Sequence, residues 1–429
     1  MTAQERLDAA LARIDDPKGE GARACLTVYR DAAKAQAEAA DARARHGITL
    51  GPLDGVIVSI KDLFDVAGEV TRAGSKLLAE EGALAAADAP VVQRLRAAGA
   101  VIIAKTNMSE FAFTGVGMNP HYGTPGNPAD RARVPGGSSS GAVVAAADGM
   151  CEIAIGTDTG GSIRIPASLC GLVGYKPSAW RIPTTGAFPL SQTMDSIGPI
   201  APSVAACAKA DAVMAGEAFL PLEAPPLAGL RIGIAQGMPL DKLDETVTKG
   251  FAAGLDALKR AGARLSDHPL PLLEDQARVN SRGGVQPPEA FTVHRDRLDR
   301  RGELVDPNVR ARLERARTIS AADYIAMLNE RNALVRRMDA QLADLDVLVM
   351  PTTPIVAPTI DEMSAQDVFA RKNAMLLRNT SIWNFFDACA ISLPLPGDGL
   401  PCGLMLVARN GHDHRLFRIA AAVERLLAA

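Results

Sequence analysis

The chain has few cysteines and few aromatic residues for its length, and its cysteines lie far apart. Six cysteines occur among 429 residues, and no two of them form a Cys-x-x-Cys pair. This spacing argues against a disulfide framework and against a zinc site. The six histidines offer no metal motif, because His412 and His414 stand two positions apart and do not share a helix face. We expect buried, reduced cysteines, no bound metal, and a polar helix start near Asp413.

The chain also lacks an excess of charge of one sign and a long hydrophobic run. Its 46 lysines and arginines nearly balance 49 aspartates and glutamates, for a net charge of −3, so nothing in the charge indicates binding to nucleic acid. The longest apolar runs are far shorter than the ~20 residues that span a membrane. Residues 1–6 lack the apolar segment of a signal peptide and resemble the first turn of a helix. We expect a cytoplasmic protein with no nucleic-acid or membrane partner.

Apolar residues make up 48% of the chain and charged residues 22%, which is typical of a globular enzyme with a sizeable core. Helix and strand patterns alternate along it. The predicted helices cover residues 3–14, 32–45, 89–98, 140–147, 244–261, 320–342 and 413–427. The predicted strands cover residues 26–29, 56–60, 101–104, 152–155, 230–234 and 346–350. This alternation predicts a largely parallel sheet covered by helices.

No internal repeat or convincing linker divides the chain, so we predict a single domain over residues 1–429 with a mainly helical excursion near 265–345. An arginine-rich run from Arg295 to Arg317 lies within that excursion. It holds eight arginines interleaved with five acidic residues. Interleaved charges of both signs predict a solvated helical face rather than a nucleic-acid surface.

Two glycine- and serine-rich segments and one lysine stand out from this background. The first segment is Gly-Gly-Ser-Ser-Ser-Gly at residues 136–141, and the second is Gly-Thr-Asp-Thr-Gly-Gly-Ser-Ile-Arg-Ile-Pro at 156–166. Lys61 follows the apolar run 56–60. The first segment lacks the Gly-Lys-Ser/Thr ending of a P-loop, and the second lacks the last glycine of the G-x-S-x-G nucleophile elbow. Taken singly, the segments are typical of flexible loops, and Lys61 of a surface residue.

In combination, the order and spacing of these features resemble the amidase signature family of serine hydrolases. Ser138 follows Lys61 by 77 positions, and Ser162 follows Ser138 by 24. Further similar stretches are residues 104–111, 174–178 and 195–199. The resemblance covers most of the chain but is loose in its C-terminal third. It implies an α/β fold in which a twisted, mixed β-sheet of many strands is enclosed by α-helices.

The resemblance also implies roles, position by position. Ser162 corresponds to the nucleophile, Ser138, entered by a cis peptide bond, to the bridging serine, and Lys61 to the base. The implied oxyanion hole consists of Thr159, Gly160, Gly161 and Ser162. The implied supporting residues are Ser139, Asp158 and Arg164. We expect Asp158 and Arg164 to hold the loop, and Ser139 to form a hydrogen bond near Lys61.

Physical chemistry explains how such a set works without a histidine. A serine hydroxyl is a poor nucleophile until a base removes its proton. Lysine is a base only when neutral, and its ordinary pKa of ~10.4 keeps it protonated at pH 7. The site must therefore bury Lys61, because burial favours the neutral amine. Ser138 can accept one hydrogen bond and donate another, which lets it pass a proton from Ser162 to Lys61. No cofactor is needed.

We predict an amide hydrolase that forms an acyl-enzyme on Ser162. Its substrate is a small-molecule amide or carbamate, and the protein is a monomer or homodimer. An alternative is the amidase component of a tRNA-dependent amidotransferase, which shares these motifs. The slightly acidic balance and compact length argue against that alternative. A non-catalytic binding protein is disfavoured because all three reacting positions are intact.

The walls of the pocket, and not the reacting groups, determine the substrate. The chain has only two tryptophans, four tyrosines and eleven phenylalanines, so clustered aromatic residues are candidates for these walls, with core packing as the alternative. The candidate pocket residues are Met108, Phe113, Trp383 and Phe386. An apolar pocket favours aryl or hydrophobic amides over glutamine or malonamic acid, with carbamates and esters as secondary substrates.

Overall fold

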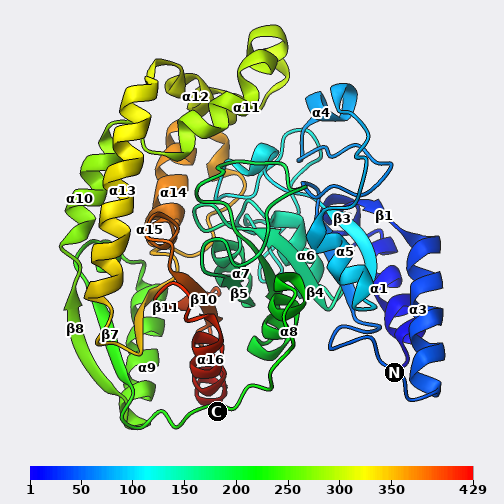
Figure 1. Ribbon diagram of the computed structural model, residues 1–429, viewed down its shortest axis with the longest axis horizontal. Helices are drawn as coiled ribbons and strands as arrows, with labels where there is room; N and C mark the ends of the chain where they lie inside the picture. The colour runs from blue at the N-terminus through cyan, green and yellow to red at the C-terminus, as the bar shows by residue number, and fades with distance from the viewer. Residues whose placement is uncertain (429) are drawn as a thin grey trace.

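The computed structural model describes residues 1–428, and a mixed β-sheet with helices on both faces forms its centre (Figure 1). Within the described residues the sheet has eleven strands in the order β1-β3-β2-β4-β6-β5-β10-β11-β9-β7-β8. The strands are β1 (Cys25–Val28), β2 (Ile57–Lys61), β3 (Val101–Thr106), β4 (Ile153–Thr157), β5 (Val173–Lys176), β6 (Ile197–Ala201), β7 (Arg231–Gln236), β8 (Arg264–Pro269), β9 (Val347–Pro351), β10 (Cys389–Pro394) and β11 (Gly403–Ala408).

The helices cover the sheet and extend beyond one of its ends. They are α1 (Ala3–Asp15), α2 (Gly21–Ala24), α3 (Arg30–Arg45), α4 (Lys76–Glu81), α5 (Pro90–Ala97), α6 (Ser140–Ala147), α7 (Arg164–Cys170), α8 (Val204–Ala215), α9 (Glu245–Arg260), α10 (Leu272–Ser281), α11 (Gln286–Arg301), α12 (Pro307–Arg315), α13 (Ala321–Gln341), α14 (Gln366–Arg378), α15 (Thr380–Phe385) and α16 (Asp413–Leu427). Every helix and strand predicted from the sequence is present, with ends that differ by at most a few residues.

The mixed α/β fold is confirmed, but the expectation of a largely parallel sheet is wrong. Only β2/β3, β2/β4, β7/β8 and β7/β9 pair in parallel among the described strands, and the other neighbours pair antiparallel. The antiparallel strands β5, β6, β10 and β11 form the middle of the sheet. They are short, contain glycine or proline, and are buried on both faces. Such strands lack the alternation of polar and apolar residues that reveals a strand in a sequence.

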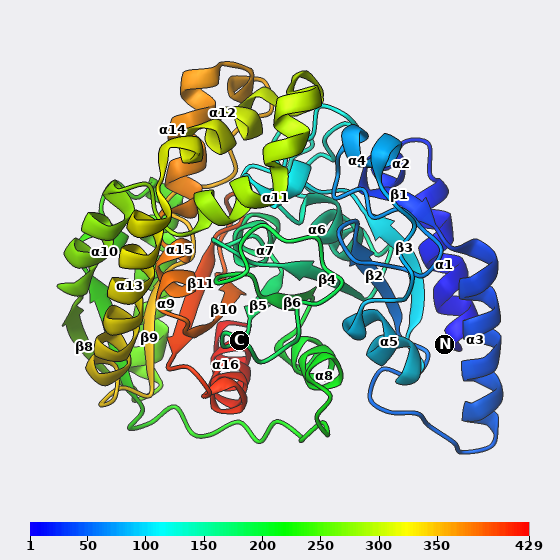
Figure 2. The ribbon, with the colours of Figure 1, turned by 45° about the horizontal axis from the view of Figure 1, so that its top comes forward.

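The excursion near 265–345 begins with a strand, β8, which pairs with β7 at the edge of the sheet. Its residues are largely polar and exposed or half-exposed, so they show no recognisable strand pattern in the sequence. The chain then continues through α10 to α13, and Figure 2 shows α11 and α12 above α6 and α7. Several arginines of the run on α11 and α12 pair with acids on the surface, such as Arg301 with Glu80 and Arg317 with Glu314. These pairs confirm the solvated face for that part of the run.

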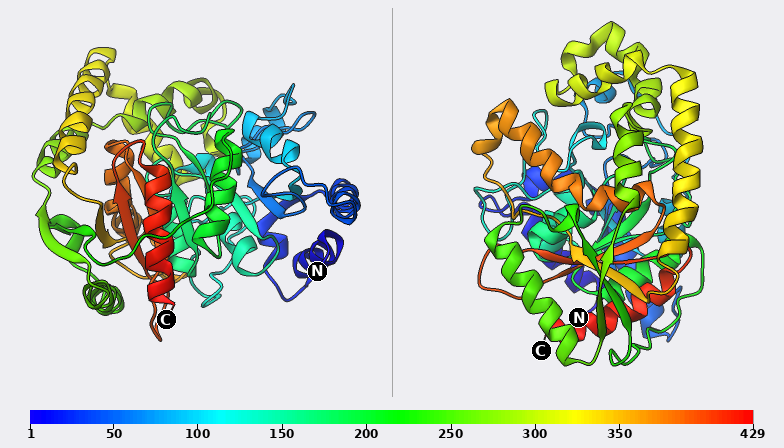
Figure 3. Two further views of the ribbon diagram at one scale, coloured as in Figure 1. Left: turned by 60° about the horizontal axis from the view of Figure 1, so that its bottom comes forward. Right: turned by 90° about the vertical axis from the view of Figure 1, so that its left-hand side faces the viewer.

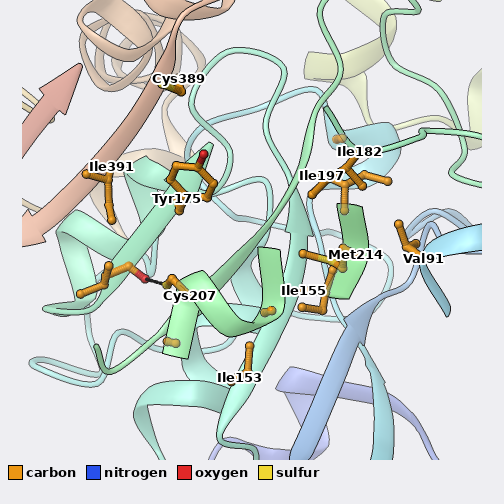
Figure 4. Packing of buried hydrophobic residues seen from close by; sticks show 14 of the residues in the cluster. Val91, Ile153, Ile155, Tyr175, Ile182, Ile197, Cys207, Met214, Cys389 and Ile391 are labelled. Carbon is orange, nitrogen blue, oxygen red and sulfur yellow. Dashed lines mark hydrogen bonds between the residues drawn. The ribbon is translucent and has the colours of Figure 1, made fainter. Parts of the chain in front are cut away.

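Side chains of the central strands alternate between two cores. In β4, Ile153 and Ile155 join the cluster that includes α5, α8 and α16, whereas Ala154 joins the cluster under α1, α3 and α6 on the opposite face. Figure 4 shows Ile153 and Ile155 with Cys207 and Met214 of α8. All six cysteines are buried and free, as expected. In Figure 3, α16 lies along one face of the sheet, between the N-terminal helices and α13.

The first residue of α16, Asp413, fastens that helix to the segment after β5. The buried carboxylate accepts hydrogen bonds from the Tyr175 hydroxyl (2.5 Å), the Ser178 backbone N–H (2.8 Å) and the Ser178 hydroxyl (2.6 Å). The predicted polar helix start near Asp413 is therefore confirmed. A buried carboxylate that accepts three hydrogen bonds is a stable arrangement in a protein interior.

Replacing Asp413 with alanine leaves these buried donors without an acceptor. We expect Asp413→Ala to lower the free energy of unfolding by about 3 kcal/mol, because each unsatisfied buried polar group carries a desolvation cost. Urea unfolding followed by circular dichroism measures this change. Asp398→Ala, on the exposed loop between β10 and β11, is the control and leaves stability nearly unchanged. Equal stability of the two variants would contradict the role of Asp413.

Candidate active site

Lys61 is the last residue of β2, and its side chain is fully buried. Its amino nitrogen Nζ lies 2.7 Å from Ser138 Oγ and 2.9 Å from Thr157 Oγ1. The peptide bond between Gly137 and Ser138 is cis. The structure thus brings together two residues, Lys61 and Ser138, that are 77 positions apart in the sequence. Thr157, at the end of the neighbouring parallel strand β4, lies within the second glycine- and serine-rich segment, but its contact with Lys61 was missed because the sequence assigned it no role.

Burial strongly affects the charge of Lys61. It lowers the pKa of the amine to about 7, although the negative charges of Asp195 and Asp158 act in the opposite direction. No carboxylate within residues 1–428 forms an ion pair with the amine; its recorded partners are two hydroxyl groups. A lysine in this state exists as a neutral amine in a substantial fraction of molecules at pH 7.

Ser162 stands between β4 and α7, where the chain leaves the sheet and enters a helix. It is almost fully buried. The Ser139 backbone N–H donates to the Ser162 carbonyl at 3.3 Å, so the residue after Ser138 contacts Ser162 directly. The two glycine- and serine-rich segments therefore meet at this hydrogen bond.

The segment from Thr159 to Ser162 has free backbone donors. None of its four backbone N–H groups donates a hydrogen bond to another group in the part of the chain that the structure describes. Gly161 has a φ of +133°, and a Cβ there would lie 2.1 Å from Thr380 Oγ1. The Thr380 hydroxyl donates to the Gly160 carbonyl at 2.7 Å. Thr380 of α15 thus holds the Gly160 carbonyl, while the N–H groups of the segment from Thr159 to Ser162 stay available to bind an anion.

A buried ion pair holds the same loop from the other side. Arg164 Nη2 lies 2.8 Å from Asp158 Oδ1, and both side chains are fully buried. The Asp158 carboxylate also accepts hydrogen bonds from the Ile163 N–H at 3.1 Å and from Asn384 Nδ2 at 2.9 Å. Burial raises the pKa of Asp158, but the charge and hydrogen bonds of Arg164 outweigh it and lower the pKa to about 2. Asp158 and Arg164 lie where loop-holding residues are expected.

The Ser139 side chain forms its hydrogen bond next to Lys61 rather than with Lys61 itself. Its Oγ donates to the Thr157 carbonyl at 3.5 Å, and no hydrogen bond between Ser139 and Lys61 occurs in residues 1–428. Ser139 therefore contacts the residue that binds Lys61 and not Lys61 itself.

A second chain of contacts links the segment from Thr159 to Ser162 to the helical region 272–341. Thr159 Oγ1 donates to Asp195 Oδ1 at 2.5 Å, and burial raises the pKa of Asp195 to about 6. Asp195 lies in the loop that also carries Ser191 and Thr193, whose hydroxyls donate to Glu289 of α11. The Tyr324 hydroxyl of α13 donates to the same carboxylate at 2.6 Å. Glu289 was missed because nothing in its local sequence distinguishes it from other helix-surface acids.

The four candidate pocket residues fall into two groups. Phe113 lines a cavity with a volume of ≈ 550 Å³. The other three lie in the core: Met108 is fully buried in the cluster that contains Phe111, and Trp383 and Phe386 pack in a cluster with Leu348 and other sheet residues. Trp383 and Phe386 thus pack away from the loop that precedes Ser162, and their place in the pocket stays a prediction.

The position of Trp383 has a simple structural reason. α15 presents Thr380 and Asn384, which are one turn apart, to the loop that precedes Ser162. Its aromatic residues therefore face the sheet and α13, where Trp383 and Phe386 pack at 6.4 Å between ring centroids. The sequence showed an aromatic cluster but not which side of the helix faces the loop.

No group of three or more metal-ligating side chains is found among residues 1–428. In the same part of the chain, no helix is both long and apolar enough to cross a membrane.

With this geometry established, comparisons with known proteins identify the family. A family model described as Amidase matches residues 5–417. The chain belongs to the amidase family. This amidase is 36% identical over 416 residues to a 2-amino-5-chloromuconic acid deaminase of Comamonas testosteroni, with 94% of this chain and 89% of the relative covered. It is 35% identical over 468 residues to a glutamyl-tRNA(Gln) amidotransferase subunit of Anaeromyxobacter sp. (strain K), with 100% and 93% covered.

A solved crystal structure of an amidase has the same fold. It superposes with a TM-score of 0.88 at 32% identity, with 100% of this chain and 96% of the other covered. The family and the fold inferred from the motifs are confirmed. This protein is an enzyme of the amidase family, whose members hydrolyse C–N bonds.

The buried ion pair makes a prediction about stability. Arg164→Met leaves the Asp158 carboxylate buried without its main partner, so we expect the free energy of unfolding to fall by about 3–5 kcal/mol. Arg371→Met is the control, because Arg371 pairs with Asp367 on the exposed surface of α14 and such pairs contribute little. Chemical denaturation of both variants measures the difference. An equally small effect of the two substitutions would contradict the role of Arg164.

Proposed function

We propose that this protein hydrolyses small amides through an acyl-enzyme on Ser162, with Ser138 as proton relay and Lys61 as base. The observation that carries the proposal is the 2.7 Å contact between Lys61 Nζ and Ser138 Oγ, at a lysine whose pKa burial lowers to about 7. A neutral amine there accepts a proton near neutral pH, which matches the requirement for a general base.

In the acylation step, Ser162 Oγ attacks the carbonyl carbon of the amide. Its proton passes to Ser138 Oγ as the Ser138 proton passes to Lys61 Nζ, which becomes an ammonium group. The carbonyl oxygen gains negative charge, and the free N–H groups of the segment from Thr159 to Ser162 are the donors that we assign to it.

The tetrahedral intermediate then loses its amine. The proton held by Lys61 returns through Ser138 to the leaving nitrogen, and the C–N bond breaks. Water attacks the resulting ester on Ser162 and gives its proton through Ser138 to Lys61. The bond between the acyl carbon and Ser162 Oγ then breaks, and the proton returns from Lys61 through Ser138 to Ser162 Oγ. The products are a carboxylic acid and an amine or ammonia, and the enzyme regains its starting protonation state.

We propose aryl or hydrophobic amides as substrates, with carbamates and esters as secondary ones. Phe113, Phe369 and Leu377 line the cavity next to the oxyanion segment and supply apolar surface for such groups. The Comamonas testosteroni relative is named for a deamination of an unsaturated acid, which supports a small-molecule substrate for this chain as well.

A second candidate function is that of one component of an amidotransferase. The similarity to the glutamyl-tRNA(Gln) amidotransferase subunit of Anaeromyxobacter extends over the whole chain and favours it. Assaying the purified chain alone on simple amides and on glutamine separates the two functions. Turnover of aryl amides without any partner supports the free-standing hydrolase, whereas glutaminase activity that requires added partner proteins supports the amidotransferase.

Substitution of the three reacting residues tests the mechanism. We expect Ser162→Ala to lower kcat by about 10,000-fold or more, and Lys61→Ala and Ser138→Ala to slow acylation strongly. The double variant Lys61→Ala with Ser138→Ala costs little more than the worse single change, because the residues act as a unit. Ser140→Ala is the matched control, since the Ser140 hydroxyl has no hydrogen-bond partner within residues 1–428. Full turnover in Ser162→Ala would exclude it as the nucleophile.

The pH dependence tests the base. Lys61 must be neutral, and its pKa is lowered to about 7, so kcat/KM for a neutral amide rises about tenfold per pH unit below ~6 and levels off above ~8. Asp195→Asn removes a negative charge that raises the pKa of Lys61, so the rising limb shifts to lower pH. Initial rates between about pH 5 and 9 measure both effects. A rate that is constant across this range would rule out Lys61 as the base.

A further inference from the structure

The carbonyl groups of the segment before Ser162 determine where its backbone N–H groups point. In a trans peptide the C=O and N–H bonds point in opposite directions. The four peptides that carry the N–H groups from Thr159 to Ser162 are all trans. A group that holds one of their carbonyls on one side therefore turns the N–H of the same peptide to the other side.

The first and the last of these four peptides are held by groups from different parts of the fold. The Asp158 carbonyl accepts hydrogen bonds from Asn384 Nδ2 at 2.9 Å and from Ser196 Oγ at 2.8 Å. The Gly161 carbonyl accepts one from the Ile165 N–H of α7 at 2.7 Å. The directions of the N–H groups at the two ends of the segment are thus fixed by the sheet loops and by α7.

The peptide between Gly160 and Gly161 is held in a different way. In the described part of the chain its carbonyl has one hydrogen-bond partner, the Thr380 hydroxyl at 2.7 Å. Neither end of this peptide carries a Cβ, and Gly161 has a φ of +133°. Such a peptide rotates at little steric cost, because glycine accepts positive as well as negative φ. Its orientation therefore depends on the hydrogen bond from Thr380.

A half turn of this peptide would exchange its two polar ends. With the carbonyl held by Thr380, the Gly161 N–H points away from α15. After a half turn, the Gly160 carbonyl oxygen would occupy the place of that N–H. An N–H there stabilises the negative charge that develops on the substrate oxygen, whereas a carbonyl oxygen repels it. The orientation of one peptide thus decides whether this part of the segment favours or opposes the reaction.

The rest of the fold places the Thr380 hydroxyl firmly. Thr380 is fully buried at the start of α15. The preceding residue, Asn379, donates from Nδ2 to the Pro351 carbonyl at 2.8 Å and to the Pro239 carbonyl at 3.0 Å, which fastens the helix start to the end of β9 and to the turn after β7. The Leu377 carbonyl is a second acceptor for the Thr380 hydroxyl but lies farther away, at 3.3 Å. The hydroxyl has one proton, and the contact of 2.7 Å with the segment is the closer one.

We propose that Thr380 is a positioning residue for the reaction: its hydroxyl holds the Gly160–Gly161 peptide so that the Gly161 N–H faces the carbonyl oxygen of the substrate. This inference rests on the proposed function and adds to it the group that keeps one oxyanion donor in place before the substrate binds. Thr380 acts through the peptide and not on the substrate. A donor that is already in place stabilises the transition state without a cost of reorientation during the reaction.

Thr380→Val tests this role, because valine has nearly the shape of threonine but no hydroxyl. With benzamide as substrate we expect kcat to fall by about 10- to 100-fold. KM stays within about twofold, because the lost interaction belongs to the transition state. Thr380→Ser keeps the hydroxyl and restores kcat to within about threefold of wild type. The pH at which kcat/KM is half-maximal does not change, because Lys61 contacts Ser138 and Thr157 and not Thr380.

Thr248→Val is the matched control. The Thr248 hydroxyl also donates to a backbone carbonyl, that of Asp244 at 3.0 Å, but it lies on the exposed side of α9. This variant keeps the kcat and KM of the wild type. An unchanged kcat in Thr380→Val would overturn the inference. A loss confined to KM would assign Thr380 to substrate binding, and a loss that serine does not restore would assign it to packing; either result would overturn the inference too.

Inhibition by 2,2,2-trifluoroacetophenone probes the oxyanion donors without amide hydrolysis. Ser162 Oγ adds to the ketone carbon, its proton passes through Ser138 to Lys61, and the ketone oxygen becomes an anion. We expect the inhibition constant to rise in Thr380→Val by about the factor by which kcat falls, and to stay unchanged in Thr248→Val. Equal inhibition of the wild type and Thr380→Val, in an enzyme whose inhibition requires Ser162, would contradict the inference alone.

Crystal structures of the wild type and Thr380→Val test the orientation of the peptide independently of any reaction. We expect one orientation in the wild type, and in the variant a Gly160 carbonyl that is turned away from α15 or adopts two orientations. A single, unchanged orientation in Thr380→Val would overturn the inference. An orientation that depends on Thr380, in a protein that hydrolyses no amide and is not inhibited through Ser162, would contradict the proposed function alone.

Discussion

The removal of Lys61 from water is the constraint on which the rest of the site depends. A strand end places the amine inside the protein, and its contacts there are the hydroxyls of Ser138 and Thr157. A carboxylate in direct contact would hold the amine in its charged form, since an opposite charge favours protonation. Of the two carboxylates that raise the pKa of Lys61, the fold pairs Asp158 with Arg164. The Asp158 carboxylate still raises the pKa of Lys61, but it is bound by Arg164 and forms no ion pair with the amine in the described part of the chain.

The sequence predicted the parts of this protein that depend on local pattern and short motifs. The helices at 140–147 and 413–427 were located to the residue, because small apolar residues and a polar start define them. The grouping of Lys61 with Ser138 was implied by the resemblance of these motifs to the amidase signature family. The middle strands β5 and β6 were not predicted, because strands buried on both faces and interrupted by Gly174 or Pro199 show no alternation.

What the sequence could not show is mainly the result of long-range packing. Thr157 contacts Lys61 because β2 and β4 are parallel neighbours, and Glu289 reaches Thr193 across 96 positions of chain. Trp383 was expected in the pocket because aromatic residues cluster around it, but hydrophobicity alone does not tell which side of α15 faces the sheet. Arg312 is one of a row of arginines in the sequence, and only the fold turns it toward a cavity.

The hydrogen bonds of Glu289 distinguish the helices that are fixed relative to the Thr159 loop from a helix that is not. Glu289 joins α11 and α13 to the loop that holds Thr159, so these helices sit in one place relative to Thr159. No such bond joins α12 to the oxyanion segment in the described part of the chain. Apart from its core residues Val309 and Leu313, the side chains of α12 can therefore change without breaking a hydrogen bond to the segment from Thr159 to Ser162.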